Sequence, residues 1–130
     1  KKIINNLGLV DITNCYGMTE TAPVSFQTSP SDSMLKKTTT VGKILMTQAK
    51  VVDDNGQTLH VGEPGEFWTK GWHVMTEYWG DRSATKKSIE DGWMKSGDIG
   101  VIDEEGYLSI VGRKKDMIIR GGENVYPKEI

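Results

Sequence analysis

The sequence predicts an α/β protein in which a β-rich region follows a short mixed α/β segment. The first observation is a set of short apolar runs of strand length, residues 41–52, 65–70 and 107–111. The second is a set of turn pairs around these runs, Asn55-Gly56, Asp91-Gly92 and Glu105-Gly106. Residues that tolerate positive φ are typical of tight hairpins. Short strands joined by turns favour a small, distorted β-barrel over residues 41–112.

The first 40 residues are predicted to contain fewer strands. Residues 11–16 (DITNCY) are typical of a short buried strand that leads into Gly17. Residues 27–40 are rich in Ser, Thr, Lys and Asp, which favours a loop with one short helix. Farther along, Asp81 can cap a helix that ends near Ile89, because an aspartate side chain accepts hydrogen bonds from the first free amides of a helix.

Length, charge and cysteine content limit the function classes. The chain has 130 residues and a net charge of −2, so it has the size of one domain and no electrostatic case for binding nucleic acid or an anionic membrane. No apolar run approaches the roughly 20 residues that a membrane-spanning helix needs. Cys15 is the only cysteine, which excludes an internal disulfide and a cysteine-based zinc site.

Both ends of the chain are expected to be cuts within a longer protein. The chain starts at Lys1 without methionine, and the residues from Pro127 onward resemble the first turn of a helix, where proline is common. A helix normally continues for several more residues.

Polar residues embedded among glycines are the candidates for chemistry. Residues 14–21 (NCYGMTET) place an aromatic ring, hydroxyls and the Glu20 carboxylate directly after a predicted strand, where α/β proteins assemble ligand sites. A hydroxyl can bond a phosphate oxygen, and a single carboxylate can share Mg²⁺ with substrate phosphates. Taken alone, a polar turn is the simpler explanation of this segment.

Three later features can likewise be explained either as parts of a ligand site or as polar turns. Asp98 could accept hydrogen bonds from both hydroxyls of a ribose, and Arg113 with its basic neighbours could grip ribose or phosphate. Gly121-Gly122 could let a narrow ligand pass close to the backbone. His60 and His73 are too isolated to form a metal cluster and are expected to be exposed or half-buried. The four tryptophans are expected to be mainly structural.

Taken in order, these segments resemble four motifs of the adenylate-forming superfamily of acyl-CoA synthetases, luciferases and peptide-synthetase adenylation domains. Residues 14–20 are similar to YGxTE, 65–79 to GELxxxGxxVxxGYW, 92–98 to WxxTGD, and 112–130 to GRxKDxIxxxGxNxxPxEI. Each motif alone is weak, but four in the same order are a strong signal. Glu77 stands where the family has a glycine, so a requirement for positive φ there would strain it.

The resemblance implies a role for each matching residue. Thr19 would contact the α-phosphate of ATP and Glu20 would bind Mg²⁺. Asp98 would accept hydrogen bonds from the ribose hydroxyls, assisted by Arg113. Asn14, Cys15, Tyr16 and Gly17 would contact adenine. Lys115 would be a hinge. Gly121 and Gly122 would border the pantetheine path of coenzyme A.

The resemblance also implies the fold: the C-terminal part of a large AMP-binding domain. Residues 1–40 would end its α/β adenylate-binding subdomain, and residues 41–112 would form its β-rich subdomain. Residues 113–130 would contain the hinge and the start of a small α+β C-terminal domain. The family's phosphate loop and its catalytic lysine are expected to lie outside the chain, so the isolated chain is expected to be inactive.

The implied activity is that of an ATP-dependent fatty acid–CoA ligase, whose partners are small molecules: a fatty acid, ATP with Mg²⁺, and coenzyme A. Residues 116–127 resemble those of fatty acyl-CoA ligases. Residues 21–24 and 74–80 resemble the mitochondrial medium-chain acyl-CoA ligases of animals, which implies a mitochondrial location. The alternatives are an adenylation domain that passes the acyl group to a carrier protein, a luciferase-like enzyme, and a non-catalytic nucleotide-binding relative.

Overall fold

The computed structural model describes residues 6–9, 11–120 and 123–125. All strand pairs are antiparallel, and they form a three-stranded sheet (β1-β2-β3), a five-stranded sheet (β4-β5-β7-β6, with β8 also on β7) and a hairpin (β9-β10). The strands are β1 Cys15–Gly17, β2 Val24–Gln27, β3 Lys43–Ile44, β4 Gln48–Val52, β5 Gly65–Lys70, β6 Ile89–Glu90, β7 Trp93–Ile102, β8 Leu108–Arg113, β9 Ile118–Arg120 and β10 Glu123–Val125.

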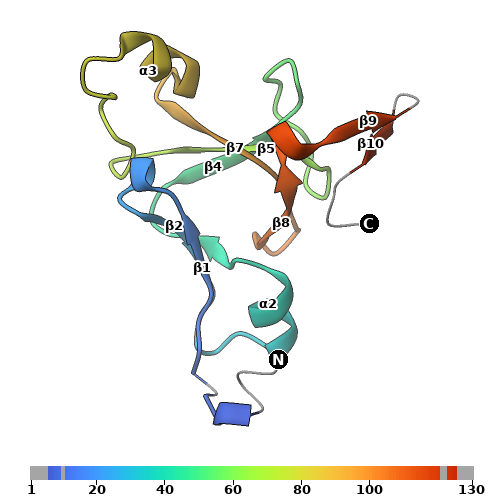
Figure 1. The fold of residues 1–130 in the computed structure, drawn as a ribbon. Coiled ribbons are helices and arrows are strands. Elements are labelled where there is room, and N and C mark those ends of the chain that lie inside the picture. The colour runs from blue at the N-terminus through green and yellow to red at the C-terminus, as the bar shows by residue number, and fades with distance from the viewer. Residues whose placement is uncertain (1–5, 10, 121–122, 126–130) are drawn as a thin grey trace.

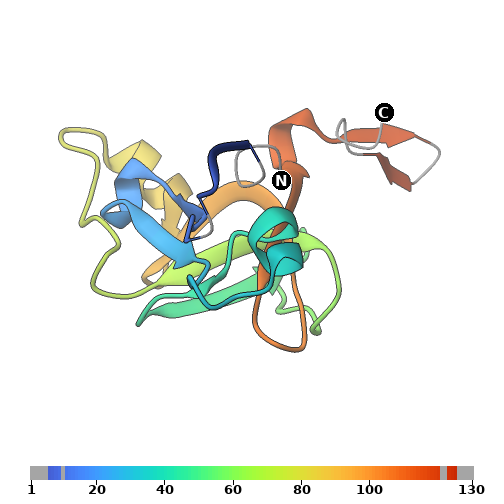
Figure 2. The ribbon, with the colours of Figure 1, turned by 90° about the horizontal axis from the view of Figure 1, so that it is seen from below.

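The five-stranded sheet is the frame of the molecule, and β7 is its longest strand. The first half of β7 pairs with β6 and its second half with β8, while β5 lies along its other edge. Figures 1 and 2 show this sheet curling, with β1 and β2 against one side. The described strands therefore form a curled half-barrel. This confirms the predicted small, distorted barrel.

Phe67 on β5 joins the two larger sheets. Its side chain is fully buried and lies in a cluster with Phe26, Val51 and Leu108. Its ring makes edge-to-face contacts with Tyr16 of β1 and Phe26 of β2, with centroid distances of 5.3 and 5.5 Å. Such aromatic pairs add to the gain from apolar burial, so Phe67 holds the short β1 strand against the half-barrel.

Both predicted helices form, and α3 begins at the cap that the sequence predicts. The helix α2 (Met34–Thr39) begins after Ser33, and α3 (Arg82–Ser88) begins after Asp81. The Asp81 carboxylate accepts a hydrogen bond from the amide of Ala84 at 2.8 Å, as expected of an N-cap. Two short 3₁₀ turns, η1 (Thr19–Thr21) and η2 (Lys114–Asp116), complete the elements. No helix in the described ranges is long and apolar enough to cross a membrane.

Two sequence predictions about strands need correction. Residues 41–52 form two strands, because the chain turns between them and Met46 adopts a φ of 45°. Residues 11–16 do not form a buried strand: β1 begins only at Cys15, which is exposed. A strand of three residues directs its central side chain to the opposite face from its neighbours, and only Tyr16 packs on the core.

Side-chain burial also departs from expectation at three residues of the segment after β5. Trp72 and Trp79 are exposed rather than structural, with exposed fractions of 76% and 94%. His73 is buried, and its Nε2 lies 3.1 Å from the hydroxyl of the buried Thr69 on β5. This segment therefore leaves the sheet as a loop that is anchored by His73 and carries its tryptophans on the surface.

Candidate functional site

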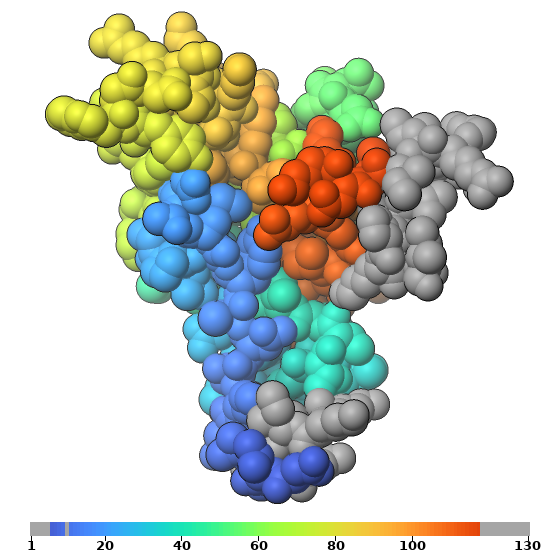
Figure 3. All heavy atoms as spheres, in the orientation of Figure 1, coloured from blue at the N-terminus to red at the C-terminus, as the bar shows by residue number. Residues whose placement is uncertain are grey.

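A cleft of about 720 Å³ lies between the β1–η1 segment, the bulged middle of β7, and the loop before α3. In the space-filling view the blue β1–η1 surface faces the yellow and orange segments across it (Figure 3). Its lining mixes polar and apolar groups and carries both charges: Tyr16, Gly17, Met18, Glu20, Glu66, Tyr78, Lys87, Ser88, Met94, Lys95, Ser96, Gly97, Asp98, Arg113, Lys114 and Lys115.

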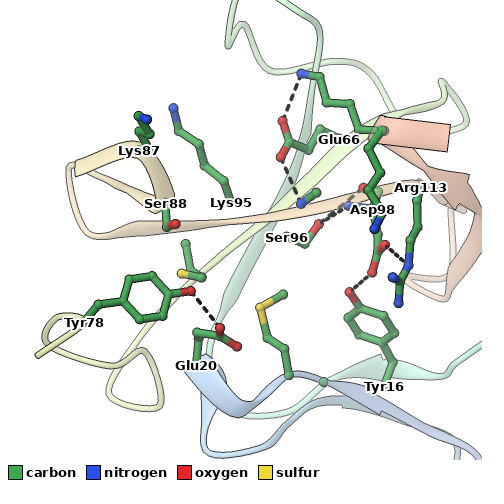
Figure 4. A pocket seen from close by; sticks show the side chains of 16 residues that line it. Tyr16, Glu20, Glu66, Tyr78, Lys87, Ser88, Lys95, Ser96, Asp98 and Arg113 are labelled. Atoms are coloured by element: carbon green, nitrogen blue, oxygen red, sulfur yellow. Dashed lines mark hydrogen bonds and ion pairs between the residues drawn. The ribbon is translucent and has the colours of Figure 1, made fainter. Parts of the chain in front are cut away.

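One side of the cleft, the strand wall, consists of Tyr16, Asp98 and Arg113 on three neighbouring strands. Asp98 and Arg113 are directly opposite each other in the β7–β8 ladder, so their side chains share one face. The Tyr16 hydroxyl donates a hydrogen bond to Asp98 Oδ2, and Arg113 Nε lies 3.6 Å from Asp98 Oδ1 (Figure 4). Burial and this hydrogen bond raise the pKa of Tyr16 well above its usual value, so Tyr16 remains a neutral donor.

A bulge in β7 places Asp98. Glu66 pairs with Ile99 and Trp68 pairs with Lys95, so Phe67 alone lies opposite residues 96–98. Such bulges aim side chains and are frequent beside active sites. Side chains satisfy the freed backbone groups: Ser96 Oγ donates to the carbonyl of Phe67 at 2.6 Å and accepts from the amide of Asp98 at 3.0 Å.

The opposite side, the loop wall, consists of Glu20 on η1 and Tyr78 on the loop before α3. The Tyr78 hydroxyl donates to Glu20 Oε1 at 2.7 Å (Figure 4). This hydrogen bond, together with burial, raises the pKa of Tyr78. Two hydrogen bonds donated by backbone amides keep these segments together. The amide of Met75 donates to the Glu20 carbonyl at 2.8 Å, and the amide of Tyr78 donates to Thr85 Oγ1 at 3.0 Å.

Gly17 is required where the two walls meet. A Cβ on Gly17 would lie 1.6 Å from the carbonyl oxygen of Pro23, so any side chain there would force β1 and β2 apart. The glycine of the predicted motif is therefore explained by a close backbone approach rather than by positive φ.

The structure brings most of the predicted site residues together. Tyr16, Gly17, Glu20, Asp98, Arg113 and Lys115 line the cleft. Asn14, Cys15 and Thr19 are exposed and are not among its lining residues. Asn14 instead donates its side-chain amide to the carbonyl of Thr40 at 3.1 Å. The adenine, phosphate and hinge roles remain predictions, and Gly121 and Gly122 lie outside the described residues.

Sequence reasoning gave no individual role to three residues whose side chains organise the cleft: Glu66, Tyr78 and Lys114. Glu66 could have been noticed, because a carboxylate inside the apolar run GEFWT needs a buried partner. Tyr78 was visible only as part of a motif. Glu77 does not have a positive φ; in this loop positive φ falls on Gly71 and Gly80, so the expected strain at Glu77 is absent.

The carboxylate oxygens of the cleft fit a nucleotide with bound Mg²⁺. Glu20 Oε2 has no hydrogen-bond partner among the described residues, and an ionised carboxylate offers about four lone-pair positions, so both Glu20 and Asp98 keep acceptor capacity. No group of three His, Cys, Asp or Glu in the described part of the chain could hold a metal ion by itself. A single carboxylate suits Mg²⁺ that is shared with substrate phosphates.

Comparison with known proteins agrees with this geometry. YngI of Bacillus subtilis, which carries the name of a proposed acyl-CoA synthetase, is 47% identical to the chain, and the alignment covers all of the chain and 24% of that protein. The mitochondrial medium-chain acyl-CoA ligase ACSF2 of Mus musculus is 41% identical, with coverage of 100% and 22%. The chain therefore spans about a quarter of the length of the curated relatives that it matches.

Solved structures show the same fold. Unliganded O-succinylbenzoate coenzyme A synthetase (MenE) of Bacillus subtilis superposes with a TM-score of 0.87 at 40% identity, over 97% of this chain and 27% of that one. The same enzyme in complex with ATP and magnesium ion superposes with a TM-score of 0.83 at 39% identity, over 95% and 28%. The model of the family described as AMP-binding enzyme matches residues 2–79, and the chain belongs to this adenylate-forming family.

Proposed function

We propose that the protein containing this chain is an AMP-forming fatty acid–CoA ligase. In the first step, a fatty acid carboxylate attacks the α-phosphate of ATP, which gives acyl-AMP and releases pyrophosphate. In the second, the thiolate of coenzyme A attacks the acyl carbonyl, which gives acyl-CoA and releases AMP. The observation that carries the proposal is the cleft with an Asp98–Arg113 pair on one wall and the Glu20 carboxylate on the other.

The strand wall suits a nucleoside. Asp98 is held by Tyr16 and Arg113 and has acceptor positions left for the two hydroxyls of a ribose, and charge-assisted bonds of this kind contribute roughly 1.5–3 kcal/mol each. The adjoining Tyr16 ring and the backbone at Gly17 offer an apolar edge for a purine. These contacts bind and orient the nucleotide, which is most of what an enzyme contributes to phosphoryl-type transfer.

The loop wall suits the metal and the phosphates. Bound Mg²⁺ would neutralise phosphate charge, and Glu20 would be its protein ligand. The Tyr78 hydroxyl holds Glu20 in place at 2.7 Å, as partners of ligating carboxylates commonly do. We propose that Thr19 reaches the α-phosphate and that Lys115 acts as a hinge between the two steps. A hinge would make Lys115→Pro impair one half-reaction more than the other.

The fatty acid and the mitochondrial location are the finer parts of the proposal. They are supported by the mitochondrial medium-chain ligase among the relatives, while the name of MenE specifies a different acid. If a tagged full-length protein were found outside the mitochondria of its host, the proposed location would be wrong. The proposed reaction would not be affected.

The test is pyrophosphate release by the full-length protein with MgATP and fatty acids of graded chain length, with and without coenzyme A. Release that peaks at one chain length and yields acyl-CoA would support the ligase and name its substrate. Pyrophosphate release without acyl-CoA formation would indicate another acyl acceptor, such as a carrier protein. Nucleotide binding without release, for every acid tested, would indicate a non-catalytic relative.

A further inference from the structure

A buried carboxylate lies beside the strand wall, among the residues that line the cleft. Glu66 on β5 is only 8% exposed, and each of its oxygens has one partner. Oε1 accepts a hydrogen bond from the backbone amide of Gly97 at 3.0 Å, and Oε2 accepts one from Lys114 Nζ at 3.1 Å. Burial of a charge is costly unless the charge is paired and hydrogen-bonded, so both contacts are needed to keep this carboxylate in the sheet.

The two partners of Glu66 flank the two members of the Asp98–Arg113 pair. Gly97 immediately precedes Asp98, and Lys114 immediately follows Arg113. Gly97 lies in the β7 bulge with a φ of +71°, and the bulge takes its amide out of register with β5. The Glu66 carboxylate therefore replaces a missing ladder partner directly before Asp98, and anchors the chain directly after Arg113.

The Lys114 contact with Glu66 is the better shielded of two ion pairs. Lys114 Nζ also lies 3.2 Å from Asp54 Oδ1, but the Asp54 side chain is 76% exposed, whereas that of Glu66 is 9% exposed. Solvent screens exposed pairs far more than buried ones. Burial alone would lower the pKa of Lys114, but the hydrogen bonds to Glu66 and Asp54 raise it, so the ammonium is charged at neutral pH.

We propose that Glu66 is a positioning residue for nucleotide binding, which acts through the Gly97 amide on Asp98 and through the Lys114 ammonium on Arg113. Figure 4 shows Glu66 on the other side of the β7 ribbon from Tyr16, so Glu66 supports the pair from across β7. This role of Glu66 rests on one part of the proposed function, that the Asp98–Arg113 pair binds a nucleotide.

The experiment measures the Kd of MgATP for the full-length protein by calorimetry in four variants. Glu66→Gln keeps the shape and an acceptor for Gly97 but removes the charge that holds Lys114. We expect Glu66→Gln and Lys114→Gln each to weaken MgATP binding roughly three- to tenfold, and the double variant to bind no more weakly than either single one. Glu66→Ala, which also loses the Gly97 contact, should weaken MgATP binding by more than about tenfold.

Matched controls and kinetics separate positioning from general stability. Glu104→Gln and Lys43→Gln change exposed residues away from the cleft and should leave the Kd unchanged. The KM for ATP should rise with little change in the KM for coenzyme A. Because Glu66→Ala leaves buried groups unpaired and could fail to fold, the isosteric Glu66→Gln variant decides the outcome. A fall in melting temperature with an unchanged Kd, or additive effects in the double variant, would overturn the proposal.

The wild-type protein distinguishes this proposal from the proposed function. Wild-type protein that binds MgATP but releases no pyrophosphate with any acid refutes the ligase, while the Kd changes would still support the role of Glu66. Wild-type protein that does not bind MgATP refutes both.

Discussion

The two walls of the cleft hold their polar side chains in different ways. On the strand wall, Asp98 sits in a bulge between paired strands, with partners on β1 and β8 and a buried carboxylate beside it. On the loop wall, Glu20 lies on a three-residue turn and meets Tyr78 on a loop whose tryptophans are exposed. Segments with few buried contacts open more easily than core strands, so we expect the strand wall to be the rigid half of the site and the loop wall the adaptable half.

The difference fits what each wall is proposed to bind. A ribose presents a fixed pair of hydroxyls throughout a reaction, whereas phosphates and their metal change position as pyrophosphate leaves. A rigid wall for the first and an adaptable wall for the second would let the nucleotide stay bound while the phosphate groups rearrange. Four predictions test this comparison.

The largest effect is expected at the core of the strand wall. Phe67→Ala removes the ring that packs on Tyr16 and Phe26, and large-to-small changes of buried Phe cost about 3–5 kcal/mol. Urea unfolding of the full-length protein, followed with hydrogen exchange in β1 and β7, measures it. Phe67→Leu, which leaves a smaller cavity, should cost less. A loss below about 1 kcal/mol would show that Phe67 does not join the two sheets.

The next effect is expected at Asp98. Asp98→Ala removes the acceptor for ribose and leaves Tyr16 and Arg113 without their partner, which should cost roughly 3 kcal/mol, more than a hundredfold in kcat/KM for ATP. Steady-state kinetics of the full-length protein measure it, with Asp11→Ala, an exposed residue outside the cleft, as the control. Equal losses in the two variants would remove Asp98 from the site.

A smaller and more specific effect is expected on the loop wall. Tyr78→Phe removes the hydroxyl that positions Glu20, and loss of such a partner typically weakens metal binding about 10- to 100-fold. The Mg²⁺ concentration for half-maximal pyrophosphate release should therefore rise by about tenfold or more, without a matching change in the KM for the fatty acid.

Tyr107→Phe is the matched control for Tyr78→Phe. It also removes a tyrosine hydroxyl bonded to an aspartate, Asp32, at 2.6 Å, but outside the cleft. It should leave the Mg²⁺ dependence unchanged. A shift of similar size in both variants would mean that the effect is on stability rather than on the metal.

The smallest effect is a pH dependence at His73, which anchors the loop that carries Tyr78. Burial lowers the pKa of His73 below its ordinary value of 6.5, so the unfolded chain takes up this proton at a higher pH than the folded one. The His73 contribution to stability is therefore complete above about pH 6.5 and is lost as the pH falls through the folded pKa. His73→Gln should flatten the fall in melting temperature below pH 6.5. An unchanged pH profile in this variant would contradict the prediction.

Several parts of the fold were predictable because they depend on residues close together in the chain. The cap of α3 at Asp81 and the strand at residues 65–70 were correct. The turn at Asp91-Gly92 was also correct, with φ of 51° and 78° at its two residues. Capping and turn conformation are local choices of a few dihedral angles. The cluster of Tyr16, Glu20, Asp98 and Arg113 was reached only through the resemblance, since each residue alone is compatible with a turn.

The sequence by itself determined the local elements and, through four collinear motifs, the family and six of the residues that line the cleft. Only the tertiary structure decided which side chains meet: Tyr16 with Asp98, Tyr78 with Glu20, and Lys114 with Glu66, pairs that are 82, 58 and 48 residues apart in the chain. These contacts depend on strand register and on the bulge at residues 96–98. Register follows from how the sheets pack around Phe67, and no local pattern in the sequence encodes that packing.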